Sequence, residues 1–277
     1  VSNQGEDYFS TNKLILYDRN SNKKKVLTGR IASSLSWSPD GRYIVYAKQE
    51  TYEKNGSTFK DLYLYDTEKE KEIRLTKGLR GSNPDFNSDG KKICFVTETN
   101  GMHQLNVYHL PEKPERDFSK KYYFDIENGL LSNKSQAEDI NYREVIIKGG
   151  WVEQLLPSDD SRQIYHPRWS NNDSSIVFDT ATEYGRNLGV YDFKTKSFRM
   201  FLKAEEELRY PYFQPDSPYL YYAASTTGIY NIYRRNMDTG ETDLLTNVTG
   251  GAMMPAVNNK GELVYACYDS IGYKIYK

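Results

Sequence analysis

The sequence contains only two cysteines, Cys94 and Cys267, among 277 residues, which excludes a small fold held together by a framework of disulfides. No apolar stretch approaches the length of about 18 residues that suggests a membrane-spanning helix. Basic and acidic residues nearly cancel, at 37 and 38, and leave a formal net charge of −1. This balance gives no global electrostatic reason to expect binding to nucleic acid or to an anionic membrane. We therefore expect no nucleic-acid partner and no membrane span.

The sequence also lacks the short motifs that mark common active sites. It has no Gly-x-Ser-x-Gly turn, no His-Glu-x-x-His pair, no Cys-x-x-Cys and no phosphate-binding glycine loop. Three histidines are present, His103, His109 and His166. His103 and His166 fall in expected loops and could share a metal, but solvated loop histidines explain them more simply. We expect this chain to be no enzyme and to hold no cofactor and no metal.

Tyrosine, in contrast, is abundant, with 25 copies, and this favours strands over disorder. Five segments share one register: an aromatic or apolar start, Asp or Asn three places later, an aliphatic residue after seven and an aromatic after nine. The segments are Trp37–Ala47, Phe86–Val96, Trp169–Asp179, Phe213–Ala223 and Ala256–Ala266. Each segment predicts a strand, a tight polar turn and a second strand, because Asp, Asn and Gly supply turn conformations.

A second pattern predicts the third and fourth strands of each repeat. At the expected third-strand place the sequence x-x-[Leu/Ile/Val]-Tyr is found six times, ending at Tyr17, Tyr65, Tyr108, Tyr191, Tyr233 and Tyr276. Apolar pairs, often Leu-Thr, follow at Leu27-Thr28, Leu75-Thr76, Leu155-Leu156, Phe201-Leu202 and Leu245-Thr246. Four short antiparallel strands in about 43 residues match the size of a propeller blade.

The expected fold class is therefore all-β: a six-bladed β-propeller of four-stranded antiparallel blades over residues 1–277. The first and last blades are expected to be incomplete, so that other segments of a longer protein would complete the ring. The spacing from Tyr108 to Tyr191 is 83 residues, which predicts an insertion at residues 111–150 within the third blade. Long loops are usually functional or disordered, and this one is either a docking arm or a decoration lying on its own blade.

These repeats resemble the TolB-like propeller family. Trp37-Ser-Pro-Asp-Gly41 matches the start of that family's repeat fully, and Phe86-Asn-Ser-Asp-Gly90 and Phe213-Gln-Pro-Asp216 match it in part. Trp169-Ser170 keeps the start but loses the glycine. The resemblance implies a bacterial, periplasmic or cell-envelope protein that binds a protein partner or a neighbouring domain of its own polypeptide.

Asp179 departs from its column in the repeat, where the other segments have Ala47, Val96, Ala223 and Ala266. A buried charge is costly without a partner. Asp179 either makes a contact facing the central channel or, as we expect, lies where its strand ends and reaches water.

The loops expected at the channel mouth carry residue types that protein interfaces favour. The candidate binding residues are Arg80, His103, His166, Tyr184, Arg186, Arg209 and Tyr210, and we expect no catalytic residue. The leading hypothesis is a non-enzymatic protein-interaction module of a bacterial envelope protein. The alternatives are a propeller that gates substrate for a peptidase domain outside this chain, and an enzyme acting on a glycan at the channel mouth.

Overall fold

The computed structural model describes residues 12–51, 57–112, 122–125, 130–132, 142–145, 150–159, 161–183 and 185–277. Within these ranges the regular structure consists of strands, with no helix. In particular, no described segment forms the long apolar helix that could cross a membrane. The chain divides into two compact units, Val1–Thr99 with Asn106–Gln154, and Asn100–Leu105 with Leu155–Lys277. The expected all-β class is confirmed.

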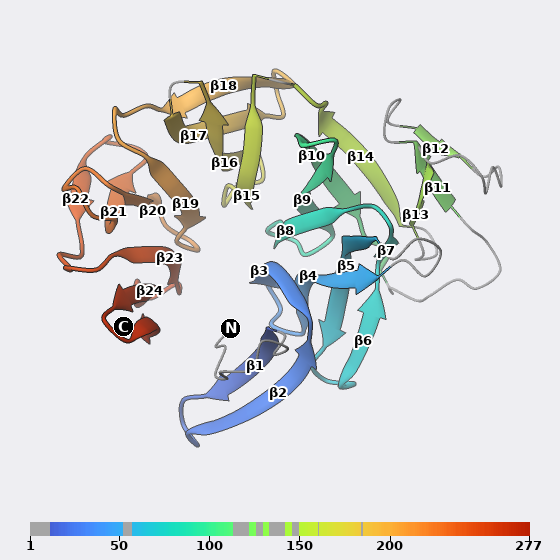
Figure 1. The fold of residues 1–277 in the computed structure, drawn as a ribbon, viewed down its shortest axis with the longest axis horizontal. Coiled ribbons are helices and arrows are strands. Elements are labelled where there is room, and N and C mark those ends of the chain that lie inside the picture. Colours follow the sequence, from blue (N-terminus) through green and yellow to red (C-terminus); the bar gives the residue numbers. More distant parts are fainter. Residues whose placement is uncertain are drawn as a thin grey trace. The chain divides into compact units, whose positions relative to one another are not determined.

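Two of the blades are four-stranded antiparallel sheets that lie in the first unit except for residues 102–105 and 155–156, which belong to the second unit (Figure 1). One runs in the order β3 (Ile31–Trp37), β4 (Tyr43–Thr51), β5 (Thr58–Asp66) and β6 (Lys71–Arg74). The other has the order β14 (Trp151–Leu156), β10 (Met102–His109), β9 (Lys92–Thr99) and β8 (Gly81–Phe86). The insertion lies between β10 and β14 in the sequence. It contributes three strands to a sheet with β7 (Thr76–Lys77); they are β11 (Tyr122–Asp125), β12 (Leu130–Ser132) and β13 (Tyr142–Val145). Its role as docking arm or decoration stays a prediction.

The second unit contains three sheets in which consecutive strands are neighbours (Figure 1). The first is β15 (Gln163–Trp169), β16 (Ser175–Thr182), β17 (Gly185–Asp192) and β18 (Ser197–Leu202). The second is β19 (Leu208–Phe213), β20 (Tyr219–Ala224), β21 (Asn231–Asn236) and β22 (Thr242–Leu244). The third has three strands, β23 (Ala252–Val257), β24 (Leu263–Asp269) and β25 (Gly272–Tyr276).

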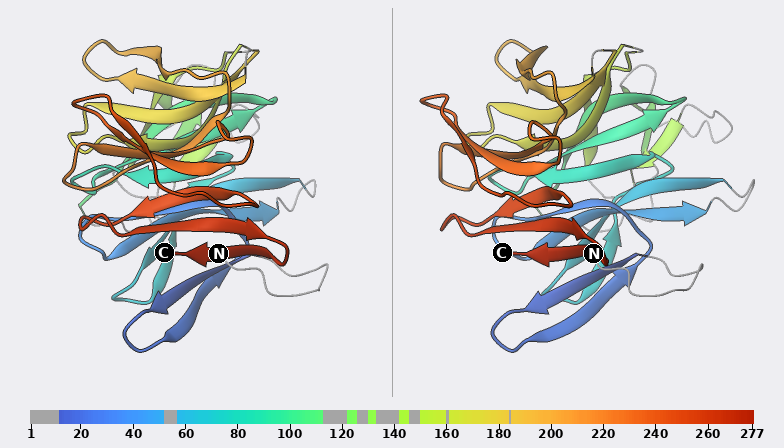
Figure 2. Two further views of the ribbon diagram at one scale, coloured as in Figure 1. Left: turned by 90° about the vertical axis from the view of Figure 1, so that its left-hand side faces the viewer. Right: turned by 60° about the vertical axis from the view of Figure 1, so that its left-hand side comes forward.

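The predicted count of six blades is wrong, because the described residues form five. Four blades have four strands and the fifth has the three strands β23 to β25. The segment expected to be the first blade supplies only β1 (Lys13–Asp18) and β2 (Lys23–Gly29), which pair as a hairpin drawn in dark blue in Figure 2. Two strands alone rarely form a stable sheet. The hairpin packs Leu14 and Leu27 against a core cluster of the β3–β6 sheet that includes Ile44 and Tyr46.

The tight turns form as the repeat predicted. Between β3 and β4, the hydroxyl of Ser38 donates to the Asp40 carboxylate and accepts from the backbone N–H of Tyr43 at 2.8 Å. Gly41 follows with a φ of 72°, a conformation that glycine adopts without strain. At the matching place after Trp169, Asp173 takes a φ of 55°, so an aspartate replaces the missing glycine.

In four of the blades a stacked aromatic pair holds the second strand to another strand of the same blade. The ring centroids of Tyr46 and Tyr63 lie 6.3 Å apart, and Tyr222 and Tyr233 lie at 5.9 Å in the same arrangement. In the β15–β18 blade, Phe178 of the second strand lies opposite Gly189 of the third strand, which has no side chain to stack on it. Phe198 of the fourth strand stacks on Phe178 in its place, with the ring centroids 5.8 Å apart. This blade therefore also has a stacked aromatic pair, but the second ring comes from the fourth strand and not from the third.

The tyrosines of the sequence pattern occupy two positions rather than one. Tyr65 and Tyr191 lie opposite Ile44 and Ile176, the aliphatic position of the second strand. Tyr233, in contrast, lies opposite the aromatic position, as Tyr63 does. The two positions are two residues apart and share one face of the strand, so the repeat stays in phase with the sheet.

The recurrent Leu-Thr pair closes the blade by a buried hydrogen-bond relay. In the β19–β22 blade the hydroxyl of Thr246 accepts from the backbone N–H of Ile232 at 2.9 Å and donates to the Asn231 side chain at 3.0 Å. Thr76 makes the same two contacts with Leu62 and Asp61, at 3.0 and 3.1 Å. The threonine thus satisfies a third-strand N–H that the fourth strand no longer reaches.

Substitution of this threonine tests the relay. Thr246→Val keeps the shape but leaves the buried Ile232 N–H without its acceptor, so we expect a loss of about 1–3 kcal/mol in the free energy of unfolding. Thr246→Ser retains the hydroxyl and is expected to lose clearly less. Denaturant unfolding of both variants provides the measurement, and equal losses would contradict the relay.

Candidate functional site

The first strand of each blade in the second unit carries a β-bulge. Irregularities in pairing fall between Tyr165 and Arg168, between Arg209 and Tyr212, and between Met253 and Ala256. One non-glycine residue in each bulge has a left-handed backbone; these are His166, Tyr210 and Met254, with φ of 45°, 57° and 55°. Asn83 does the same in β8, with φ of 52°. Such conformations are strained for residues with side chains and often occur at functional sites, where bulges redirect a side chain.

Each of these four residues stands directly before a buried proline; the prolines are Pro84, Pro167, Pro211 and Pro255. Proline has no backbone N–H and therefore leaves no donor unsatisfied where the ladder is interrupted. The sequence analysis missed this x-Pro signal, which lies at the same distance before the end of β8, β15, β19 and β23.

Asp179 of β16 is the electrostatic centre of the site. Its carboxylate is fully buried and accepts from His166 Nδ1 at 2.9 Å and from Arg186 Nε at 2.7 Å, with a second guanidinium contact at 2.5 Å. The expectation that Asp179 reaches water is therefore wrong, because the strand continues to Thr182 and the side chain lies beneath His166 and Arg186. A buried carboxylate with several strong donors holds those donors in fixed positions.

Aromatic rings pack around the two side chains that Asp179 holds. The guanidinium of Arg186 lies 3.9 Å from the ring centroid of Tyr165, and the rings of His166 and Tyr210 are 4.4 Å apart. His103 packs edge-on against Tyr165 at 4.8 Å, and its Nδ1 lies 2.7 Å from the carbonyl oxygen and 3.1 Å from the nitrogen of Ile164. Cation–π contacts and aromatic pairs of this kind fix orientation as well as adding stability.

A second ion pair adjoins this group on β19. Glu207 accepts from Arg209 and from the hydroxyl of Tyr230, and the Arg209 guanidinium lies 5.4 Å from the Tyr230 ring centroid. The hydrogen bond from Tyr230, aided by Arg209, lowers the pKa of Glu207. Burial, reinforced by the bond to Glu207, raises the pKa of Tyr230 to about 12, and burial also raises the pKa of Tyr210. Glu207 is therefore ionised and both tyrosines are neutral at physiological pH.

The structure brings together five of the seven predicted residues: His103, His166, Arg186, Arg209 and Tyr210. They lie on strands, whereas the sequence placed them in loops. Arg80 belongs to the first unit, where its guanidinium lies 4.3 Å from the Phe59 ring centroid. Tyr184 lies outside the described residues.

Sequence reasoning missed three members of the site: Tyr165, Glu207 and Tyr230. Tyr165 adjoins His166, so the bulge that redirects His166 would have located both. Glu207 and Tyr230 come directly before two different strands of one blade, β19 and β21, and no local spacing relates them.

The arrangement offers aromatic faces, two guanidinium groups and two histidines, held by the buried carboxylate of Asp179 and the partly exposed carboxylate of Glu207. Tyrosine and arginine on a rigid support are typical of residues that dominate protein interfaces. Within the part of the chain that the structure describes, no three His, Cys, Asp or Glu side chains gather as a metal site would require.

Comparison with known proteins gives relatives of two kinds. Tol-Pal system protein TolB of Francisella tularensis is 34% identical over 113 residues, which are 39% of this chain and 24% of the relative. Dipeptidyl-peptidase 5 of Porphyromonas gingivalis is 27% identical over 138 residues, 47% of this chain and 16% of the relative. The matches thus span less than a quarter of the length of these curated relatives. No protein-family model matches the chain.

Among solved structures, TolB from Acinetobacter baumannii superposes with a TM-score of 0.67 at 19% identity, covering 95% of this chain and 56% of that protein. At this identity the likeness concerns the fold, and it agrees with the sequence match to TolB. The chain therefore has the fold of a TolB-like β-propeller, which confirms the resemblance carried by its Trp-Ser-Pro-Asp-Gly repeats.

Proposed function

We propose that this chain is a non-enzymatic protein-interaction module of a bacterial cell-envelope protein and that it works in the periplasm. The similarity to the Tol-Pal system protein TolB, in sequence and in fold, supports this function. The partner is a protein or a neighbouring domain of the same polypeptide.

The observation that carries the proposal is the support of the site by Asp179. Because this fully buried carboxylate binds both His166 and Arg186, their side chains are ordered before a partner arrives. A preorganised surface loses less conformational entropy on binding than a mobile one. The binding surface comprises these two residues together with His103, Arg209 and Tyr210, which lie in the same unit.

Site-specific crosslinking tests this surface. A photoreactive phenylalanine analogue replaces Tyr210 in the site or, as the matched control, the exposed Tyr273 of β25. In an envelope extract of the source bacterium we expect a discrete crosslinked protein from position 210 that Arg186→Ala reduces at least tenfold. Products that are the same from both positions, or none from position 210, would refute the assignment.

A second candidate function is a regulatory propeller that gates substrate for a peptidase domain outside this chain. The match to dipeptidyl-peptidase 5 favours it, because that match covers nearly half of this chain. The full-length reading frame decides between the two: a hydrolase domain following residue 277 supports the peptidase alternative, and a frame without one refutes it.

A further inference from the structure

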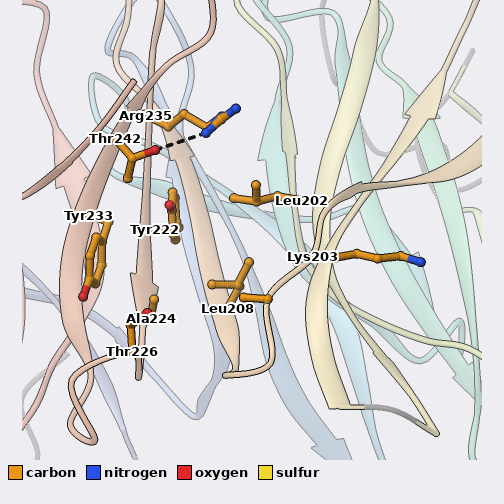
Figure 3. Close-up of a pocket in the computed structure, with 10 residues that line it drawn as sticks. Leu202, Lys203, Leu208, Tyr222, Ala224, Thr226, Tyr233, Arg235 and Thr242 are labelled. Atoms are coloured by element: carbon orange, nitrogen blue, oxygen red, sulfur yellow. Dashed lines mark hydrogen bonds between the residues drawn. The ribbon is translucent and has the colours of Figure 1, made fainter. Parts of the chain in front are cut away.

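A hollow of about 270 Å³ lies between the β15–β18 blade and the β19–β22 blade. Leu202 and Leu208 line it on one side, and Tyr222 faces them from β20 (Figure 3). Leu208, Tyr222 and Ala224 belong to the buried core cluster of this unit. The hollow therefore borders the packed core between two blades and is partly open to solvent.

A small residue in the connection between β18 and β19, residues 203–207, explains why the hollow exists. Three connections from the fourth strand of one blade to the first strand of the next donate a backbone N–H to a third-strand Asp or Asn; the donors are Leu79, Ala204 and Val248, and the acceptors are Asp61, Asn187 and Asn231. The shared bond makes these three donors equivalent. Leu79 is fully buried in its core cluster and Val248 packs against another. Ala204 is the smallest of the three, and it lines the hollow.

The lining is apolar except at one end, where it is cationic. Arg235 of β21 donates to the Thr242 hydroxyl at 3.1 Å, and Figure 3 shows this pair above Leu202 and Tyr222. Lys203 contributes its stem, and its ammonium group points away from the other side chains (Figure 3). None of the ten lining residues is acidic. An anion at the Arg235 end thus meets a positive charge and no opposing carboxylate.

The volume of the hollow limits the size of the apolar part of a ligand that could bind in it. A cavity of about 150 Å³ binds benzene, so a hollow of this size holds roughly ten carbon atoms. We propose that this hollow is a binding site for a small carboxylate with an apolar body of about eight to ten carbon atoms. The apolar body contacts Leu202, Leu208 and Tyr222, and the carboxylate accepts from Arg235. This site is separate from the Asp179 surface and does not depend on the function proposed for that surface.

Octanoate and its neutral analogue octanamide are the probes for this site. In calorimetric titration, kept below the micelle concentration, we expect the wild-type chain to bind octanoate with a dissociation constant of about 1 mM or lower. Ala204→Leu fills the hollow, so it is expected to raise the melting temperature and to weaken octanoate binding at least tenfold. Arg235→Gln is expected to weaken octanoate binding about fivefold and to leave octanamide binding unchanged.

Arg234→Gln is the matched control, since Arg234 points to the opposite face of β21 and pairs with Asp243 at 2.6 Å. It is expected to bind octanoate as the wild type does. Absence of wild-type binding, or binding that Ala204→Leu changes less than twofold, would overturn the site. Equal affinity for octanoate and octanamide would overturn the assignment of a carboxylate. Should Ala204→Leu lower the melting temperature, Ala204→Val is titrated under the same criterion.

Discussion

Replacing Asp179 with alanine is expected to lower the free energy of unfolding by about 3 kcal/mol, since removing one partner of a buried ion pair leaves the other without compensation. Asp179 is fully buried, whereas Arg186 and His166 keep 15% and 19% of their side-chain surface. This partial exposure lets water solvate the two freed side chains, which places the loss at the lower end of the usual range. Denaturant unfolding followed by tryptophan fluorescence measures it.

Asp243→Ala is the matched control for this experiment. Asp243 also pairs with an arginine, Arg234 at 2.6 Å, but its side chain is 55% exposed. Exposed pairs contribute little, so we expect a change within about 0.5 kcal/mol. If the two variants lost equal stability, burial would not be what makes the Asp179 pair important. Asp179→Asn keeps one acceptor oxygen and is expected to fall between wild type and Asp179→Ala.

Gly250→Ala is expected to destabilise the protein by about 3 kcal/mol, because overpacking against backbone cannot be relieved by a side-chain movement. A Cβ atom at this position would lie 1.9 Å from the carbonyl oxygen of Tyr268. The backbone is close here because the Tyr268 N–H donates to the Gly251 carbonyl at 2.8 Å, which fixes the connection against β24. The clash between the new Cβ atom and the Tyr268 carbonyl oxygen can be relieved only if the hydrogen bond between Tyr268 and Gly251 breaks.

Two measurements identify this cause. Thermal or denaturant unfolding gives the overall loss, and amide hydrogen exchange at Tyr268 reports whether the local bond has opened. Thr249→Ala, at the exposed neighbouring residue, is the control and is expected to change stability by less than about 0.5 kcal/mol. Faster exchange at Tyr268 in Gly250→Ala alone supports the steric argument, and unchanged exchange would contradict it.

The sequence predicted the antiparallel strands and their turns because each turn is determined within a few residues. Ser38, Asp40 and Gly41 complete one turn among themselves and Tyr43. The number of blades could not be obtained in this way, since a tyrosine pattern such as the one ending at Tyr17 reports a strand and not whether a full sheet surrounds it.

The pairing of side chains between strands was less accessible to sequence analysis. Nothing local to Gly189 indicates that Phe198 covers it, because the contact depends on how β17 and β18 pair. Asp179 was recognised as unusual because the other repeats have a small or apolar residue at its position. Its partners His166 and Arg186 could not be predicted, because they come from different strands and meet Asp179 only in the folded sheet.

The bulges of β8, β15, β19 and β23 separate backbone geometry from side-chain identity. Asn83, His166, Tyr210 and Met254 share one left-handed conformation although an amide, an imidazole, a phenol and a thioether have little chemistry in common. A mutation at one of these positions changes the surface chemistry of a single blade and leaves the equivalent position on its neighbour intact. Selection can therefore alter recognition in small, independent steps, one blade at a time, without redesigning the scaffold.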